Sequence, residues 1–322
     1  MVLITGGAGY IGGTTARYLI SRGEEVVILD SLISSKKEAV PENAVFYHGD
    51  ISNRLLIKDI ATKHNIDACL HFAAFIEVGE SVINPSKYFH NNTANALSLF
   101  TSLKDAGVKH IVFSSTAAVY GEPENIPIEE NHPLKPLNPY GMSKFFTENI
   151  LNSFSDAYGV THIALRYFNA CGAWGRGEEH NPETHLIPLV LQVPLGKRDK
   201  IYINGCDYAT PDGTCLRDYI HVYDLAAAHY LALQYLRSGG KSEKINLGNG
   251  KGYSIKEVIE TARKIANHPI PAEIRKRRAG DPAVLIASSQ KAADILGWKP
   301  EYYKLEDMIS SAYEWHKMNN HG

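Results

Sequence analysis

A tyrosine and a lysine placed four residues apart are the first candidates for chemistry in this sequence. The segment NPYGMSK sets Tyr140 and Lys144 at the start of a helical run, so both side chains lie on one helix face about one turn apart. A free tyrosine has a pKa of ~10 and is a poor base at neutral pH, but a nearby ammonium group favours its phenolate. The pair could therefore take a proton from a hydroxyl group while hydride leaves the carbon. Because this spacing often occurs by chance, its meaning depends on the rest of the chain.

Three hydroxyl side chains end a predicted strand in the segment FSSTAAVYG. They belong to Ser114, Ser115 and Thr116, and one of them could hydrogen-bond the reacting oxygen atom. The alternative is ordinary turn chemistry, in which Ser and Thr hydroxyls bond to nearby backbone.

A glycine-rich turn opens the sequence, in VLITGGAGYIGG. Gly6, Gly9 and Gly12 are spaced three residues apart between an apolar run and a predicted helix that begins near Tyr10. Without Cβ atoms, these positions permit a tight turn, close approach of a pyrophosphate and close packing of helix on strand, while the helix N-terminus offers free N–H groups to the anion. On its own the motif is weak evidence, since glycines also end ordinary strands.

An acidic residue follows the glycine turn at the distance that a dinucleotide site needs. Asp30 ends the next apolar run, VVILDSL, roughly 20 residues on, where a carboxylate binds the adenosine ribose hydroxyls. A carboxylate there repels a 2′-phosphate, so NAD is favoured over NADP; the alternative reading of Asp30 is a simple turn former. Lys36 and Lys37 are interpreted as a solvated surface pair, and Asp50 ends a third strand where the adenine edge would lie.

The elements that would position these residues alternate between strand and helix. Helical periodicity covers 11–21 and 85–106, and β-branched apolar runs predict strands at 2–5, 25–29, 45–47, 68–72, 110–115 and 162–167. This alternation predicts an α/β fold of the Rossmann type, a doubly wound parallel sheet with helices on both faces. The carboxyl ends of such strands bind ligands, which would bring the glycine turn and the tyrosine to one edge.

The pattern changes after Asn169, where a long polar loop, CGAWGRGEEHNPETH, begins. We expect an NAD-binding domain at 1–169 and a smaller mixed α/β substrate domain at 170–322. The apolar runs at 220–222 and 244–247 are candidates to return to the first sheet. The sequence shows neither an internal repeat nor a low-complexity tract.

The composition argues against nucleic acid and membranes as binding partners. The formal net charge of −2 and the 21% of charged residues give no field that would gather nucleic acid or an anionic membrane. The first predicted strand leaves no room for a signal peptide, and no apolar stretch reaches the ~18 residues of a membrane span. We therefore expect a cytoplasmic protein.

No metal site is predicted. The cysteines form no C-x-x-C pair, and His180 and His185, in HNPETH, lack a clear third ligand. The cysteines are Cys69, Cys171, Cys206 and Cys215.

Together, these segments resemble the extended short-chain dehydrogenase/reductases. The glycine turn, SSTAAVYG and the Tyr140-x-x-x-Lys144 pair carry that resemblance. Further blocks make the similarity to the UDP-glucose 4-epimerase family extend over essentially the whole chain: HFAAFIEVGESV, RYFNACGA, THLIPLV, PDGTCLRDYIHVYDLA, NLGNGKGYS and RRAGDPA.

The resemblance implies an isomerase that inverts C4 of UDP-galactose and UDP-glucose through a 4-keto intermediate. Permanently bound NAD would take hydride from the sugar and return it to the opposite face, without net oxidation. Tyr140 would be the base at the 4-hydroxyl, Lys144 would lower its pKa and hold the nicotinamide ribose, and Thr116 would be the hydroxyl partner.

The same resemblance implies two sets of binding residues. For NAD, besides the catalytic residues, these are Gly6, Gly9, Tyr10, Ile11, Gly12, Asp30, Ser31, Ser34, Ser35, Asp50, Ile51, Phe72, Ala73, Ala74, Asn91, Tyr167 and Phe168. For the UDP-sugar they are Thr116, Tyr140, Asn169, His185 and Leu186 through their backbone, Tyr202, Asn204, Arg217, Tyr219, Arg278, Asp281 and Leu285.

Simple physics supports part of the second set. Arg217 and Arg278 can form forked, charge-assisted hydrogen bonds to a diphosphate, and Asp281 can accept from ribose hydroxyls. Alternatively, the RKRR run at 275–278 is a solvated surface charge run, an interpretation that suits Arg275 and Lys276 better than Arg278.

Three positions depart from the commonest family pattern. Ile76 replaces a cofactor-contacting lysine found in some members, and Ser31 replaces a frequent asparagine, which would redistribute the grip on NAD. Leu285 stands where a large aromatic residue excludes an N-acetyl group in some members. Because leucine is smaller, UDP-N-acetylglucosamine and UDP-N-acetylgalactosamine are further expected substrates.

Other functions remain open on the same fold. A nucleotide-sugar dehydratase or decarboxylase often carries an acid after the Ser/Thr, because its chemistry needs a further proton donor; here Ala117 and Ala118 occupy that place. The sequence discriminates poorly against a reductase that releases its cofactor, whereas a nucleotide-sensing regulator would be expected to lack the Tyr/Lys pair.

The helices at 85–106 and 142–158 could pair across a two-fold axis into a homodimer, or their apolar faces could serve the monomer core.

Overall fold

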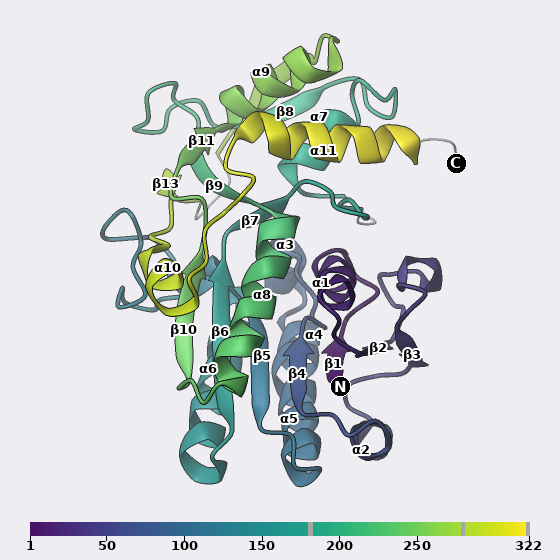
Figure 1. Ribbon diagram of the computed structural model, residues 1–322. Helices are drawn as coiled ribbons and strands as arrows, with labels where there is room; N and C mark the ends of the chain where they lie inside the picture. The colour runs from purple at the N-terminus through teal and green to yellow at the C-terminus, as the bar shows by residue number, and fades with distance from the viewer. Residues whose placement is uncertain (180–182, 278–280, 320–322) are drawn as a thin grey trace.

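The computed structural model describes residues 1–179, 183–277 and 281–319. A seven-stranded parallel sheet dominates it, in the order β10-β6-β5-β4-β1-β2-β3 (Figure 1). Its strands are β1 (Val2–Thr5), β2 (Val26–Asp30), β3 (Val45–His48), β4 (Ala68–His71), β5 (His110–Thr116), β6 (Thr161–Tyr167) and β10 (Glu243–Leu247).

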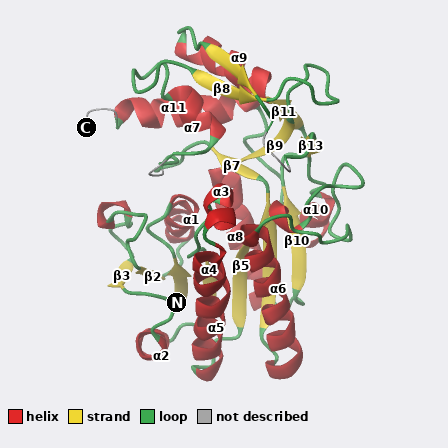
Figure 2. Ribbon diagram, turned by 180° about the vertical axis from the view of Figure 1, so that it is seen from behind, coloured by secondary structure: helices red, strands yellow, loops and turns green. Residues whose placement is uncertain are grey.

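Helices cover both faces of this sheet because alternate strand residues point to opposite sides. In β1, Val2 and Ile4 belong to a core shared with α1 (Tyr10–Ser21) and α8 (Val222–Arg237). Leu3 belongs to the opposite core, shared with helices that Figure 2 shows from their own side: α2 (Arg54–Lys63), α5 (Ala96–Asp105) and α6 (Pro139–Tyr158). The predicted doubly wound fold class is confirmed.

The C-terminal part forms smaller sheets beyond the carboxyl ends of the large sheet (Figure 1). In one sheet, β9 (Leu216–His221) pairs with β7 (Asn169–Cys171), β11 (Gly252–Ser254) and β13 (Val284–Leu285). In the other, β8 (Ile201–Asn204) pairs with β12 (Ala272–Arg275). The accompanying helices are α7 (Leu186–Leu191), α9 (Ile255–Ala266), α10 (Gln290–Leu296) and α11 (Leu305–Met318).

The chain passes between the two parts more than once. The prediction that 244–247 returns to the large sheet is confirmed, since this run lies in β10, parallel to β6. The same prediction for 220–222 is wrong, because Ile220 and His221 end β9 in the smaller sheet and Val222 begins α8. After β9, α8 returns to pack beside α1. A division of the chain at residues 169 and 170 therefore stays a prediction.

The predicted helix at 85–106 is broken into three pieces. It consists of α4 (Pro85–Tyr88), a π-helical segment (Phe89–Asn95) and α5, and a short helix, α3 (Val78–Ile83), precedes it. None of the described helices is long and apolar enough to cross a membrane.

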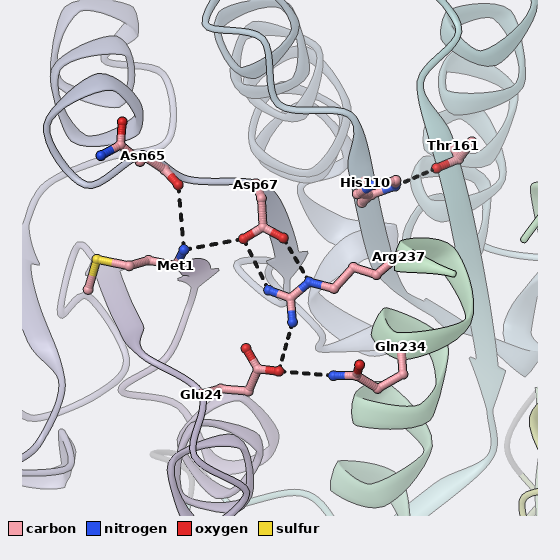
Figure 3. A network of polar contacts seen from close by, with 8 residues as sticks. All are labelled: Met1, Glu24, Asn65, Asp67, His110, Thr161, Gln234 and Arg237. Atoms are coloured by element: carbon pink, nitrogen blue, oxygen red, sulfur yellow. Dashed lines mark hydrogen bonds and ion pairs between the residues drawn. The ribbon is translucent and has the colours of Figure 1, made fainter. Parts of the chain in front are cut away.

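A polar network fastens α8 to the amino ends of the central strands (Figure 3). Arg237 donates from Nε to Asp67 Oδ2 at 2.7 Å and from Nη1 to Glu24 Oε1 at 2.7 Å. The backbone nitrogen of Met1 also reaches Asp67, at 3.3 Å, and Gln234 donates to Glu24 at 2.9 Å. This network lies at the edge of the sheet opposite to the predicted site, so it supports the scaffold rather than the chemistry.

A buried ion pair fixes α6 against the sheet. Arg166 of β6 donates from Nε to Glu148 Oε1 at 3.0 Å and from Nη2 to Oε2 at 2.6 Å, and the side chains are only 1% and 2% exposed. Ser115 of β5 donates to Glu148 at 2.5 Å, and Arg166 also donates to the Tyr120 hydroxyl at 3.0 Å. Forked pairing of this kind fixes orientation as well as distance, so it sets how α6 lies on β5 and β6.

Removing one charge of this pair should cost much of the protein's stability. In Glu148→Gln, Arg166 keeps its charge without a counterion, and breaking a buried pair costs about 3–5 kcal/mol. We expect a loss of this size in the free energy of unfolding, measured with denaturant. The matched control is Glu124→Gln, which breaks the exposed pair with Lys135 and should change stability little; equal losses in both variants would contradict the role of the buried pair.

Candidate active site

The glycine turn between β1 and α1 is packed as closely as its composition suggests. Gly6 has a φ of +74°, and a Cβ atom there would lie 2.6 Å from the backbone nitrogen of Ala73. A Cβ on Gly12 would lie 2.3 Å from the Gly6 carbonyl oxygen. Gly9 is the N-cap of α1, so the first N–H groups of the helix, which have no partner within the helix, face an incoming anion.

Asp30 is held in place at the end of β2 by three hydrogen bonds. The backbone N–H groups of Ala8 and Leu32 donate to its carboxylate at 2.9 Å and 2.8 Å, and Ser35 Oγ donates at 2.9 Å. This binding leaves an oriented anion beside the glycine turn, which suits ribose hydroxyl groups and repels a phosphate.

A pocket runs from the glycine turn past Asp30 to the end of β4. The predicted cofactor residues that line it are Gly6, Gly9, Asp30, Ser31, Ser34, Ser35, Asp50, Ile51, Phe72, Ala73, Ala74 and Asn91. Its lining also includes Leu29, Ile33, Gly49 and Phe75. Of these, Ile33 is 68% exposed, and the residues predicted from the sequence are instead the neighbouring serines, Ser31, Ser34 and Ser35. A side-chain-free turn, a ribose-binding acid and apolar walls fit NAD.

The remaining predicted cofactor residues lie outside this pocket. Tyr10, Ile11 and Gly12 form the first turn of α1, and the Tyr10 hydroxyl points elsewhere, donating to the Gly172 carbonyl at 2.7 Å. The others stand at the ends of β5 and β6 and on α6: Thr116, Tyr140, Lys144, Tyr167 and Phe168.

The π-helical segment supplies a positioning residue that the sequence did not reveal. Asn92 is buried, accepts from the Phe75 N–H at 2.9 Å and donates to the Phe75 carbonyl at 2.9 Å. It also donates to Ser143 Oγ, at 3.2 Å. Asn92 therefore ties the pocket wall at Phe75 to α6, while its neighbour Asn91 lines the pocket.

The start of α6 brings Tyr140 to the end of β5. Asn138 caps the helix by accepting from the Gly141 N–H at 2.9 Å, and Pro139 occupies the first turn, where its missing N–H costs nothing. A Cβ on Gly141 would lie 2.6 Å from the Ala118 carbonyl oxygen. Gly141 therefore lets the start of α6 pack closely on the turn after β5, which brings Tyr140 near Thr116.

Packing distinguishes the three hydroxyl residues at the end of β5. Ser114 forms a short hydrogen bond with the Tyr167 hydroxyl, and Ser115 donates to Glu148. Thr116 is the one that bonds to Tyr140, while its Oγ1 also accepts from the Ala118 N–H at 3.1 Å. Each hydroxyl thus has its own partner, and the geometry favours Thr116 as the residue beside the reacting oxygen.

Burial acts on both members of the Tyr/Lys pair. It raises the pKa of Tyr140 above 10; the hydrogen bond from Thr116 opposes this rise and the nearby charge of Glu77 adds to it. Burial lowers the pKa of Lys144 to about 7, against the opposing charge of Glu148. The Lys144 ammonium donates to the Ser114 carbonyl at 2.8 Å. The spacing predicts a lowered pKa for Tyr140, but in the protein on its own desolvation of the phenolate outweighs that effect.

The predicted UDP-sugar residues come from several C-terminal elements. Arg217 of β9 forms an ion pair with Asp281 and donates to the Pro282 carbonyl at 2.8 Å. Leu285 of β13 is the register partner of Arg217 and packs on the cluster that includes Ala117, next to Thr116. Arg278 lies outside the described residues.

Other predicted substrate residues are less directly placed. Asn169 donates to the Asp218 carbonyl at 2.7 Å, and the Tyr219 ring lies in the core of the C-terminal part. On β8, Tyr202 and Asn204 share one face, and the Arg275 guanidinium stacks on the Tyr202 ring. Their contacts with a sugar nucleotide stay predictions.

His185 and Leu186 begin α7 next to two acids. Burial alone would lower the pKa of His185, but hydrogen bonds and charge from Glu178 and Glu183 raise it to about 10. His185 Nδ1 lies 3.1 Å from Glu178, so the imidazolium is paired with carboxylates. His180 lies outside the described residues, and in the part of the chain that is described no three His, Cys, Asp or Glu side chains are grouped to hold a metal ion.

A hydrogen bond joins the segment after β4 to the polar loop before α7. The hydroxyl of Thr184 donates to Glu77 Oε2 at 2.8 Å, although the residues are 107 positions apart in the chain. Glu77 is the N-cap residue of α3 and its charge also acts on Tyr140. Sequence reasoning missed Glu77, which gives no local signal beyond an acid in an apolar segment.

The fold and these residues define a class. A parallel Rossmann-type sheet with a glycine turn, a ribose-binding acid and a Tyr/Lys pair at its carboxyl edge is the arrangement of the short-chain dehydrogenase/reductases. More narrowly, the chain belongs to the NAD dependent epimerase/dehydratase family, whose sequence profile matches residues 2–248.

Similar proteins cover the whole chain. The UDP-glucose 4-epimerase of Halalkalibacterium halodurans is 54% identical over 100% of this chain and 97% of its own length. The crystal structure of UDP-glucose 4-epimerase from Brucella ovis in complex with NAD superposes with a TM-score of 0.95, at 41% identity over 97% of both chains. The UDP-Glc/GlcNAc 4-epimerase of Campylobacter jejuni has a TM-score of 0.87 and 41% identity, covering 98% of this chain and 99% of its own.

Glu77 provides a test of the electrostatics. Glu77→Gln removes a charge that raises the pKa of Tyr140, so we expect that pKa to fall and phenolate to form at lower pH. The measurement is the ultraviolet absorbance of phenolate against pH, with Tyr140→Phe as the background. Thr184→Ala breaks the same contact but keeps the charge, so it should leave the pKa near that of the wild type. An equal shift in both variants would show that the contact, not the charge, acts on Tyr140.

Proposed function

We propose that this protein catalyses the reversible epimerisation of UDP-galactose and UDP-glucose at C4, with Tyr140 as the base. The observation that carries the proposal is the position of Tyr140 at the start of α6, which packs closely on Ala118, with Thr116 opposing the rise in the pKa of the phenol and Ala117 and Ala118 following Thr116 in the chain. One hydroxyl and one phenol can move a single proton, whereas elimination of water calls for a further acid. UDP-glucose 4-epimerases similar over the full chain support the same conclusion.

The pocket beside Asp30 would hold the cofactor. The first turn of α1 offers N–H groups to the pyrophosphate, Asp30 accepts from the adenosine ribose, and Lys144 is proposed to bind the nicotinamide ribose. NAD, when bound, supplies the hydride acceptor and a positively charged ring. That charge would favour the phenolate that burial disfavours.

The proton steps belong to the protein. Tyr140 takes the proton of the 4-hydroxyl group while Thr116 donates a hydrogen bond that stabilises the phenolate. The 4-keto sugar then turns so that its other face meets the same groups, and Tyr140 returns the proton to the oxygen. A base that both accepts and returns one proton leaves the protein unchanged after each cycle.

UDP would be held by residues of the C-terminal part, on β9 and in the segment before β13. Arg217 is paired with Asp281 in the protein on its own, so its fork is already oriented, and a diphosphate would share it. Arg278 is proposed as a second diphosphate ligand and Asp281 as an acceptor from the uridine ribose. The backbone at His185 and Leu186, with Asn169, Tyr202, Asn204 and Tyr219, completes the proposed site.

We also propose that UDP-N-acetylglucosamine and UDP-N-acetylgalactosamine are substrates. Leu285 packs on the cluster that contains Ala117, Phe168 and Tyr120, so its size affects the space next to Thr116. Leucine occupies less of that space than an aromatic ring. The similar protein from Campylobacter jejuni, named for both sugars, supports this extension.

A homodimer in the cytoplasm, serving galactose metabolism, is the proposed setting. A surface groove between α5 and α6 is lined by Leu97, Phe146, Asn149, Ile150, Ser153 and Phe154. Leu97 and Phe146 are each 42% exposed, and pairing the groove with its copy across a two-fold axis would cover them. Sedimentation velocity tests the dimer directly.

Tyr140→Phe removes the proton acceptor and leaves the cofactor pocket intact. We expect turnover of UDP-galactose to fall by at least ~10²-fold while the purified protein keeps its NAD. Turnover is followed by the UDP-glucose formed, and NAD is quantified after denaturation of the protein. Near-normal turnover in this variant would overturn the assignment of the base.

Leu285→Tyr should narrow the range of substrates. A phenol ring in place of leucine fills the space proposed for the N-acetyl group, so kcat/KM for UDP-N-acetylglucosamine should fall more than kcat/KM for UDP-glucose. The matched control is Leu55→Tyr, at a leucine that is 82% exposed on α2, which should change neither value. A parallel fall for both sugars in Leu285→Tyr would refute the role of this position in selectivity.

A further inference from the structure

The loop that follows β7 reaches back to the glycine turn. Arg176 donates from Nη1 to the carbonyl oxygen of Ala8 at 2.7 Å, across 168 positions of sequence. In the opposite direction, the Tyr10 hydroxyl donates to the carbonyl oxygen of Gly172 at 2.7 Å. Two hydrogen bonds of opposite direction thus join the same two segments, which fixes their relative orientation as well as their distance.

The residue that Arg176 binds, Ala8, is also the one that holds the ribose acid. Ala8 is fully buried, and its N–H donates to Asp30 Oδ2 at 2.9 Å. The two ends of this residue are therefore fixed, one by Asp30 and the other by Arg176. Any movement of the glycine turn away from the pocket has to break or stretch one of these bonds.

The loop is itself firmly attached. Trp174 packs against Tyr18 of α1 and Tyr223 of α8, with ring centroids 6.0 Å and 5.4 Å apart. The N–H of Ala173 donates to Ser311 Oγ of α11 at 3.1 Å. The loop therefore links the glycine turn to a helix of the C-terminal part, which is proposed to bind the sugar nucleotide.

The loop also packs on Arg17, which holds the adenosine segment (residues 31–39) against α1. A Cβ on Gly175 would lie 3.1 Å from Cδ of Arg17, so the loop backbone packs directly on that side chain. Arg17 donates to the carbonyl oxygens of Gly13 at 3.1 Å and Ala39 at 2.8 Å. The loop therefore supports Arg17, whose hydrogen bond to Ala39 holds the adenosine segment against α1.

We infer that Arg176 is a cofactor-retention residue, which keeps the glycine turn and the adenosine segment closed over NAD by tying them to the C-terminal part. This inference rests on the proposed NAD site and adds a retention role to it. On this inference, release of a cofactor bound beside the turn and Asp30 is faster when these parts separate. The bond from the Arg176 guanidinium to Ala8 opposes that separation without touching the reacting atoms.

The measurement is the rate at which the full-length protein loses NAD. Wild type and Arg176→Ala are purified with NAD, diluted into an excess of NAD-degrading enzyme, and the remaining bound NAD is quantified over time. A hydrogen bond from a charged donor is worth enough to change a rate by about tenfold or more. We therefore expect Arg176→Ala to lose NAD about tenfold faster, and added NAD to restore its turnover.

Two further variants separate retention from general damage. Arg198→Ala removes another partly buried arginine, whose Nε donates to Gln192 at 3.3 Å, and should retain NAD as the wild type does. Tyr10→Phe removes the reciprocal bond to Gly172 and should also speed the loss of NAD at a temperature well below its thermal unfolding midpoint, where the protein is fully folded. This variant keeps the inference testable if Arg176→Ala does not fold.

The outcomes distinguish the inference from the proposed function. Loss of NAD from Arg176→Ala and Tyr10→Phe at the wild-type rate overturns the inference and leaves the epimerase proposal untouched. A wild-type protein that holds NAD but does not interconvert UDP-galactose and UDP-glucose overturns the proposed function, whereas faster NAD loss in the variants would still support the retention role.

Discussion

The buried pair of Glu148 and Arg166 is the interaction on which the geometry of the site depends. Two opposite charges excluded from water require complete pairing, and here the forked contact, Ser115 and Tyr120 supply it. That requirement leaves α6 a single arrangement on β5 and β6. Because Lys144 lies one helical turn from Glu148, and Tyr140 lies two turns away, the same contact places both candidate catalytic groups at the strand ends.

The electrostatics of the site follow from its position in the core. Burial moves the pKa of Tyr140 up and that of Lys144 down, so both groups shift toward their neutral forms. One neighbour opposes each shift: Thr116 lowers the pKa of Tyr140, and the charge of Glu148 raises the pKa of Lys144. Glu148 therefore has two functions, since it orients α6 through Arg166 and supports the charge of Lys144. If Tyr140 is the base, as proposed, the remaining stabilisation of its phenolate is expected from the bound cofactor.

Local spacing accounts for what the sequence could predict. The glycine turn, Asp30, and the shared face of Tyr140 and Lys144 are set by short-range geometry, so strand and helix periods suffice to place them. Local spacing alone left Ser114, Ser115 and Thr116 open, and only the family resemblance pointed to Thr116; the partners that occupy Ser114 and Ser115, on β6 and α6, are visible only in the fold. Asn92, Glu77 and Arg176 carry no local signal, because their partners lie 17, 107 and 168 positions away. The π-helical break at Phe89–Asn95 was likewise hidden, since an apolar helix period runs through it.

The repeated crossing of the chain gives these distant contacts a common cause. After β6 the chain leaves the large sheet through β7, returns through α8 and β10, and leaves again. Each crossing brings a segment of the C-terminal part beside the carboxyl ends of the large sheet, where Thr184 meets Glu77 and Arg176 meets Ala8. These contacts therefore join the two parts close to the cofactor pocket. A site that keeps its cofactor through both halves of the proposed reaction needs a fixed backbone on the cofactor side, and Ala8 supplies it through its hydrogen bonds with Asp30 and Arg176.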